Sequence, residues 1–235
     1  MIILAFDSTA KVASVAVLDG ERVLGVTNID NGLTQSELLL PMAEDLLKSL
    51  KLGFADVELL ACSVGPGSFT GVRIGAALVK GLAFGRGIPC AAVSTLEALA
   101  YNLMPAKGRI VAVMDARRAQ VYSATFTSDG EALSRLTEDR AVSIAELCDE
   151  IAKESEPVYL VGDGYDAVCR ELLARGIEFP ETPYALRYEN AASVARVAYL
   201  DMQSGRTVSD LEIQPTYLRM PQAERERLER EKTNK

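Results

Sequence analysis

The chain has 235 residues, a formal net charge of −8 and no histidine. Without histidine, the chain lacks Ser-His and Cys-His nucleophile pairs and every zinc site that uses a histidine ligand. The excess of acidic residues argues against tight nucleic-acid binding by the chain alone, because neutralising phosphates requires a basic surface.

The cysteines and the apolar segments indicate a protein of a reducing compartment. Each cysteine lies in an apolar segment and their spacing matches no metal-binding or CxxC motif, so we expect four buried free thiols. They are Cys62, Cys90, Cys148 and Cys169. The opening residues, MIILAFD, predict a buried strand rather than a signal peptide. The longest apolar-rich stretch, 72–84, is too short for a membrane span, so we expect a cytoplasmic protein. The cysteine spacing and the absence of histidine predict no metal site, and we expect no cofactor.

The first half of the chain begins with three predicted strands. Residues 2–7 form a buried strand ending in Asp7, a second strand starts near Val12, and the Asp-Gly turn at 19–20 leads into a third. Residues 34–37, TQSE, have the form of a capping box and start an apolar helix that runs to Leu50.

A glycine turn links the next strand to the next helix. The buried strand 59–64 meets Gly65-Pro66-Gly67-Ser68, and a helix begins near Thr70. A further strand at 88–93 and a short helix after Ser94 complete this half.

The second half repeats the first. Residues 110–115 again form a strand ending in an acid, Asp115, and a second strand and an Asp-Gly turn follow. A helix from Ser143, a strand at 158–161 and a turn of sequence Gly-Asp-Gly at 162–164 then precede a last helix. The repeated unit is β-β-β-α-β-α, which predicts an α/β fold of two tandem ribonuclease-H-like domains with mixed sheets.

Composition suggests four parts. The first domain spans 1–104 and the second, smaller domain spans 105–190, with the boundary in the stretch MPAKG at 104–108. Residues 191–220, with a helix at 191–203, are expected to pack back on the body. Residues 221–235 are nearly all charged and predict a frayed helix or a disordered tail.

Two linked copies of this unit resemble the plan of the actin-like (ASKHA) ATPases and sugar kinases, in which nucleotide lies between the halves. The residues here that would face a nucleotide or anion are Asp7, Ser8, Gly65, Gly67, Ser68, Thr70 and Asp115. The opposing interpretation is structural: both acids satisfy turn amides, and the glycines allow a tight turn and close packing. The loop is neither a Walker A motif nor GxGxxG, and both interpretations stay open.

Two helices of the first domain carry more apolar surface than their own sheet requires. Gly71 and Gly75 share one face of the second of these helices, which suggests a groove that a partner helix can approach. A protein–protein interface is one explanation, and mutual burial of the two helices on one sheet face is the other. The expected partner-binding residues are Leu39, Met42, Leu46, Gly71, Val72, Ile74, Gly75, Leu78 and Leu82.

Residues 65–75, GPGSFTGVRIG, resemble the signature of the TsaB (YeaZ) family. Supporting matches are ILAFDS at 3–8, VSTL at 93–96, MDAR at 114–117 and PTYLR at 215–219. The resemblance therefore covers about residues 1–220. The first helix departs from the family pattern, because Gln35 stands where His-Ser-Glu often begins.

The resemblance implies a non-catalytic paralogue of TsaD within the actin-like superfamily. Such proteins act with TsaD and the ATPase TsaE to place threonylcarbamoyl on an adenosine of tRNA, and TsaD carries the metal and the chemistry. It also implies that the two first-domain helices bind TsaD, that a homodimer forms through the same face, and that tRNA is met only within the complex. The rival functions are a small actin-like ATPase or kinase that uses Asp7 and Asp115, and a glycoprotease-type peptidase.

Overall fold

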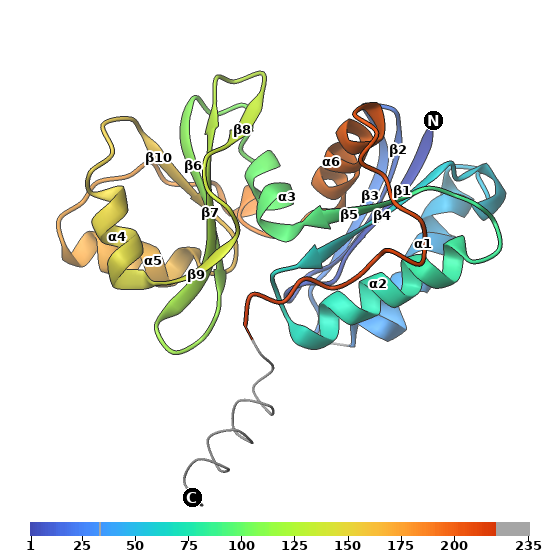
Figure 1. Ribbon diagram of the computed structural model, residues 1–235, viewed down its shortest axis with the longest axis horizontal. Helices are drawn as coiled ribbons and strands as arrows, with labels where there is room; N and C mark the ends of the chain where they lie inside the picture. The colour runs from blue at the N-terminus through green and yellow to red at the C-terminus, as the bar shows by residue number, and fades with distance from the viewer. Residues whose placement is uncertain (33, 220–235) are drawn as a thin grey trace, which may run out of the picture.

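The computed structural model describes residues 1–32 and 34–219 (Figure 1), so the predicted charged tail at 221–235 lies outside the described residues. Two mixed sheets stand side by side, each of five strands, and helices cover their faces. The predicted α/β fold of two units with mixed sheets is confirmed by this arrangement.

The first sheet has the strand order β3-β2-β1-β4-β5. Its strands are β1 (Ile2–Asp7), β2 (Ala13–Asp19), β3 (Arg22–Ile29), β4 (Leu59–Gly65) and β5 (Cys90–Ser94). The first three are antiparallel, whereas β4 and β5 run parallel to β1. Gly20, at a φ of +58°, makes the predicted tight turn between β2 and β3.

The second sheet repeats this plan, with the order β10-β6-β7-β8 and β9 paired to β7. Its strands are β6 (Gly108–Asp115), β7 (Gln120–Ser128), β8 (Leu133–Arg135), β9 (Arg140–Ser143) and β10 (Val158–Val161). The short strand β9 was not predicted, and the predicted third strand is shortened to the three residues of β8.

Six α-helices and two 3₁₀ turns complete the described chain. They are α1 (Gln35–Ser49), α2 (Phe69–Ala83), α3 (Thr95–Tyr101), α4 (Ile144–Ile151), α5 (Tyr165–Ala174), α6 (Ala191–Gln203), η1 (Phe54–Asp56) and η2 (Tyr184–Leu186). Ser68, Ser94, Ser143 and Asn190 each accept a backbone N–H at a helix start. The capping box predicted at Thr34 is not formed, because its side chain caps no amide.

The helices build a separate core on each face of each sheet. Helices α1 and α2 cover one face of the first sheet, and α6 covers the other. Helices α4 and α5 cover the outer face of the second sheet, and α3 covers its inner face. Because α3 also packs on α6, these two helices join the domains (Figure 1).

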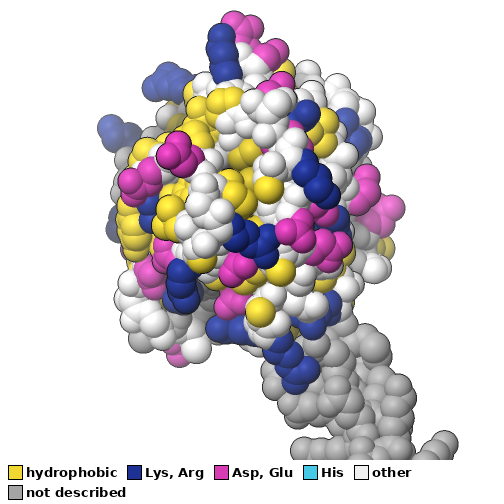
Figure 2. All heavy atoms as spheres, turned by 90° about the vertical axis from the view of Figure 1, so that its left-hand side faces the viewer, with side chains coloured by type: hydrophobic (Ala, Val, Ile, Leu, Met, Phe, Trp, Pro, Cys, Tyr) yellow, Lys and Arg dark blue, Asp and Glu magenta, His cyan; other side chains and the backbone are white. Residues whose placement is uncertain are grey.

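The outer face of the second domain carries charges of both signs. Figure 2 shows Lys and Arg interspersed with Asp and Glu and with apolar side chains over this face, rather than gathered into one basic surface. That distribution agrees with the argument from net charge against tight nucleic-acid binding by the chain alone. None of the helices in the described part of the chain is long and apolar enough to cross a membrane.

Candidate functional site

The carboxylate of Asp7 lies at the end of β1 and is almost fully buried. Its Oδ1 accepts hydrogen bonds from the backbone N–H of Thr9 at 2.9 Å and from the Thr9 hydroxyl at 2.7 Å. Its Oδ2 accepts from the hydroxyl of Ser63 on β4 at 2.5 Å. Burial raises the pKa of Asp7, and these three hydrogen bonds oppose that rise. Both oxygens are therefore engaged within the first domain.

The glycine loop after β4 is filled by neighbouring backbone. A Cβ atom on Gly67 would lie 2.6 Å from the carbonyl oxygen of Thr9, and one on Gly71 would lie 1.9 Å from that of Ser8. The N–H of Ser68 donates to the Thr9 carbonyl at 2.6 Å. These contacts favour the interpretation in which the glycines permit close packing of the two turns, because the chain itself occupies the space beside them.

Other residues of the expected anion site lie around the same turn. The Ser8 hydroxyl donates to the carbonyl of Gly71 at 2.9 Å, so it fixes the first turn of α2. A Cβ atom on Gly65 would lie 2.5 Å from the carbonyl oxygen of Thr216, where the C-terminal segment passes. Thr70 is exposed in the first turn of α2.

Asp115 occupies the matching place in the second domain but is exposed. Its carboxylate accepts from the N–H of Arg117 at 2.7 Å and forms an ion pair with the Arg117 guanidinium at 3.0 Å. Its own N–H donates to Asp163 at 2.8 Å. The carboxylate of Asp115 is thus paired with an arginine rather than left free.

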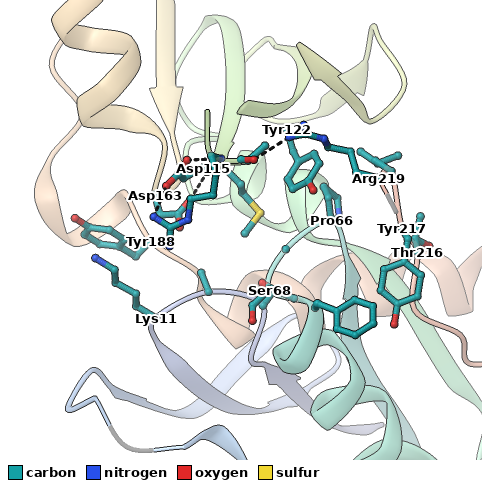
Figure 3. Close-up of a pocket in the computed structure, with 18 of the residues that line it drawn as sticks. Lys11, Pro66, Ser68, Asp115, Tyr122, Asp163, Tyr188, Thr216, Tyr217 and Arg219 are labelled. Atoms are coloured by element: carbon teal, nitrogen blue, oxygen red, sulfur yellow. Dashed lines mark hydrogen bonds and ion pairs between the residues drawn. The ribbon is translucent and has the colours of Figure 1, made fainter. Parts of the chain in front are cut away.

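A cleft of about 600 Å³ separates these two turns (Figure 3). Ser68 and Lys11 line it from the first domain, and Asp115 and Tyr122 line it from the second. The structure therefore brings Gly67, Ser68 and Asp115 to one cavity, whereas Asp7 and Ser8 lie behind its wall.

Sequence reasoning missed several residues of this cleft, namely Lys11, Asp163, Tyr188 and Arg219. Asp163 lies in the second Gly-x-Gly turn, so the internal repeat contained a signal for it. Arg219 closes the PTYLR segment and donates to the carbonyl of Ala116 at 2.9 Å. Lys11 and Tyr188 carry no local signal, because only the tertiary fold brings them to the cleft.

The structure corrects part of the expected partner surface. Leu39, Met42 and Val72 are at most 5% exposed because they pack into the core of their own subunit. Gly71 and Gly75 face Ser8 rather than an open groove, since a Cβ atom on Gly75 would lie 2.9 Å from the Ser8 hydroxyl oxygen. The expectation that these five residues present a free surface is therefore wrong for the isolated subunit.

The other residues of that set remain accessible in part. Leu46 packs on β3, where a Cβ atom on Gly25 would lie 2.7 Å from one of its methyl carbons. Ile74, Leu78 and Leu82 are half-buried along one flank of α2. Leu40 at the start of α1 and Phe84 after α2 are exposed, the latter by 76%.

The described residues contain no group of three or more cysteine or acidic side chains arranged to hold a metal ion. All four cysteines are free and buried, as predicted. Burial raises the pKa of Cys90 and of Cys169 to about 11, so neither thiol is a ready nucleophile at neutral pH.

Residues 33–225 match the family model of TsaD, described as tRNA N6-adenosine threonylcarbamoyltransferase. The tRNA threonylcarbamoyladenosine biosynthesis protein TsaB of Haemophilus influenzae is 32% identical, over 92% of this chain and 93% of that protein. The TsaB of Escherichia coli is 32% identical over 93% and 95%, and that of Bacillus subtilis is 28% identical over 99% and 100%. The structure of YeaZ from Pseudomonas aeruginosa superposes with a TM-score of 0.76 at 26% identity, covering 92% of this chain and 99% of that one.

The family model spans most of the chain, and the relatives match it nearly from end to end. The glycine-rich segment 65–75, on which the sequence resemblance rests, is the turn that packs β1 against α2 in the fold. The chain belongs to the TsaB (YeaZ) family and takes part in the biosynthesis of tRNA threonylcarbamoyladenosine.

Proposed function

We propose that the chain is a non-catalytic subunit that binds TsaD and supports the engagement of TsaE and tRNA. The observation that carries this proposal is the internal engagement of the turn where an actin-like ATPase would meet phosphates. Both carboxylate oxygens of Asp7 accept hydrogen bonds, one from Thr9 and the other from Ser63. The backbone of Ser8 and Thr9 occupies the space beside the glycines of the loop. Because these groups are engaged within the subunit, they stabilise the fold rather than serve catalysis.

The proposed contact with TsaD lies on the outer side of α2 and the adjoining start of α1. Ile74, Leu78 and Leu82 form a half-buried apolar flank that α1 and the sheet do not cover completely. Leu40 on α1 and Phe84 at the end of α2 are exposed apolar side chains on the same two helices. A second copy of the chain would meet the same area when TsaD is absent, which accounts for the homodimer that the family resemblance implies.

Gly81 offers the cleanest test of this surface. It lies on the outer side of α2, and a Cβ atom there would meet no described atom beyond its own stretch of helix within 4 Å, so a long side chain fits the free subunit. We expect the Gly81→Arg protein to fold with unchanged circular dichroism but to lose co-elution with co-expressed TsaD in size exclusion, because a cation would enter an apolar contact. Leu173→Arg, at a position on α5 that is 67% exposed, is the control. Normal co-elution of Gly81→Arg would place the TsaD contact elsewhere.

The cleft supports one second candidate, a small actin-like ATPase or kinase. Its volume of about 600 Å³ suits a nucleotide, and Lys11, Arg117 and Arg219 supply cations. Isothermal titration of the isolated chain with Mg-ATP distinguishes the two functions. Micromolar binding with turnover would support the ATPase, and weak or absent binding would support the scaffold.

A further inference from the structure

Residues 187–191 cross from the second domain to the first and are fixed at both ends. The carbonyl of Arg187 accepts from the N–H of Gly162, after β10, at 2.7 Å. The N–H of Ala191 donates to the hydroxyl of Ser14, on β2, at 2.7 Å. Asn102, which follows α3 directly, donates to the carbonyl of Tyr188 at 2.8 Å. The midpoint of this crossing segment is Glu189.

Glu189 is a buried acid without a partner. It is 2% exposed, and neither Oε1 nor Oε2 has a hydrogen-bond partner among the residues that the structure describes. Buried polar groups are normally hydrogen-bonded, and an unpaired buried charge costs far more free energy than an unpaired neutral carboxyl. The geometry therefore favours the protonated form of this side chain.

The charged groups that act on Glu189 most strongly are all carboxyls. They are Asp7 at the end of β1, Asp163 after β10 and Asp30 after β3. Asp7 pairs with Ser14 in the β1–β2 register, and Ser14 holds the end of the crossing segment, so this segment lies beside Asp7. The cations of this region, Lys11 and Arg117, act on Asp163 instead.

Asp7 is the better placed of these acids to carry a charge. It accepts three hydrogen bonds, whereas Glu189 accepts none from any other described residue. Burial first, and then the charges of Asp7 and Asp163, raise the pKa of Glu189 well above its usual value of 4.5.

We propose that Glu189 is a proton-linked latch of the domain junction. With its carboxyl neutral, the crossing segment packs between the two domains. Loss of the proton would leave an unpaired negative charge beside Asp7, and the segment would leave its contacts with Gly162 and Ser14 so that the charge could reach water. The latch thus makes the coupling between the domains depend on pH.

The sign of the linkage follows from the direction of the shift. The folded protein keeps a proton that the unfolded chain releases above pH 4.5, so the stabilisation is complete below that value and falls as the pH rises towards the folded-state pKa. Within this window the unfolding equilibrium constant gains about tenfold per pH unit from this one group.

Glu189→Gln keeps the shape of the side chain and removes its ionisation. Urea unfolding between pH 5 and 9 is expected to give a ratio of wild-type to Glu189→Gln unfolding constants that rises at least about tenfold across the series. Glu178→Gln, at an exposed position before the crossing segment, should follow the wild type. A ratio for Glu189→Gln that stays constant with pH would overturn the proposal.

Amide hydrogen exchange tests the location of the effect. As the pH rises, the protection factors of Gly162 and Ala191 are expected to fall at least about tenfold before that of the core amide of Leu60 changes. If the protection factors of all three amides fell together, the effect would be global destabilisation and the proposed latch would be contradicted.

A measurement on the unaltered protein covers the case in which the variant does not fold. The ¹³C shift of the Glu189 carboxyl should titrate well above pH 4.5. Titration near the usual value would contradict a neutral acid. A gain in the stability of the unaltered protein at high pH on addition of Na⁺ or Mg²⁺, with the cation bound at this carboxylate, would also contradict it.

Discussion

A Cβ atom on Gly71 would lie 1.9 Å from the carbonyl oxygen of Ser8, whereas one on Gly81 of the same helix would meet nothing within 4 Å in the described part of the chain outside its own helical turns. The two glycines thus have opposite roles. The first allows the turn after β1 to touch the start of α2, and the second exposes helix backbone with no packing benefit. The sequence alone does not distinguish such glycines, and it suggested a shared groove at Gly71 and Gly75.

Gly71→Ala is expected to destabilise the protein by about 3 kcal/mol or more, because the Ser8 backbone must move. Gly81→Ala is expected to stabilise it by about 0.5–1 kcal/mol, since alanine is the better helix former. Urea unfolding of the two variants measures both effects. Equal effects of the two substitutions would contradict the packing described for the glycine loop.

The two strand-end acids should also differ. Asp7→Ala leaves the Ser63 hydroxyl and the Thr9 groups without their buried acceptor, which should cost about 2–4 kcal/mol. Asp115→Ala loses an exposed ion pair and should cost less than about 1 kcal/mol.

Neither substitution should lower the tRNA-modification rate of the assembled complex by more than about tenfold at a temperature where the variant is folded. A loss of about a hundredfold with Asp115→Ala, whose fold is not at risk, would instead favour a catalytic role for these acids.

Serine caps at the helix starts show how one local motif differs with its surroundings. Ser143 caps α4 by accepting from the N–H of Glu146, and its hydroxyl has no further hydrogen-bond partner among the residues that the structure describes. Ser94 caps α3 in the same way and also donates to Asp139 of the second domain at 2.6 Å. Asp139 is held by Arg135, which also pairs with Glu97. The cap of α3 is therefore also a link between domains.

Ser143→Ala should cost about 1 kcal/mol, the usual value of a cap. Ser94→Ala should cost roughly 1–2 kcal/mol more, because it also removes a hydrogen bond to a carboxylate. Thermal unfolding followed by circular dichroism compares the two variants. A Ser94→Ala protein as stable as Ser143→Ala would indicate that the bond to Asp139 contributes nothing.

Sequence patterns predicted the elements whose signals are local. The helix expected at 191–203 is α6, and Asp-Gly marked the turn between β2 and β3. The strand Arg140–Ser143 was missed because four residues with little alternation form a strand only through pairing with β7. The sequence suggested that α1 has more leucines than its own sheet can cover, but Gly25 on β3 leaves a space that Leu46 fills. No sequence pattern marked Glu189, because it is buried only where the folded chain crosses from one domain to the other.

At the scale of the whole molecule, the described C-terminal segment runs back along the first domain (Figure 1). Ile213 is fully buried in the core beneath α1 and α2. The N–H of Thr216 donates to the carbonyl of Val64 at 2.7 Å, and Tyr217 packs on Phe69 and accepts from Arg73. Arg219 then reaches Ala116 in the second domain.

Deletion from Pro221 onward should change the melting temperature by less than about 2 °C, because the removed stretch has few apolar residues to bury. Deletion from Glu212 onward should lower it by roughly 5–10 °C, since the core loses Ile213. Differential scanning calorimetry of both truncated chains provides the comparison. A large drop with the shorter deletion would mean that residues beyond 220 dock on the body.

Helix α6 covers one face of the first sheet, although it follows the entire second domain in the chain. On a translating ribosome, the nascent first sheet therefore has only α3 to cover part of that face while the strands of the second domain are being made. Ile3 and Ala5, among the first residues synthesised, receive their covering from Val194 and Ala198, nearly two hundred residues later. The first domain to begin synthesis is thus the last to be completed, and a nascent chain stalled before α6 would carry an exposed apolar sheet.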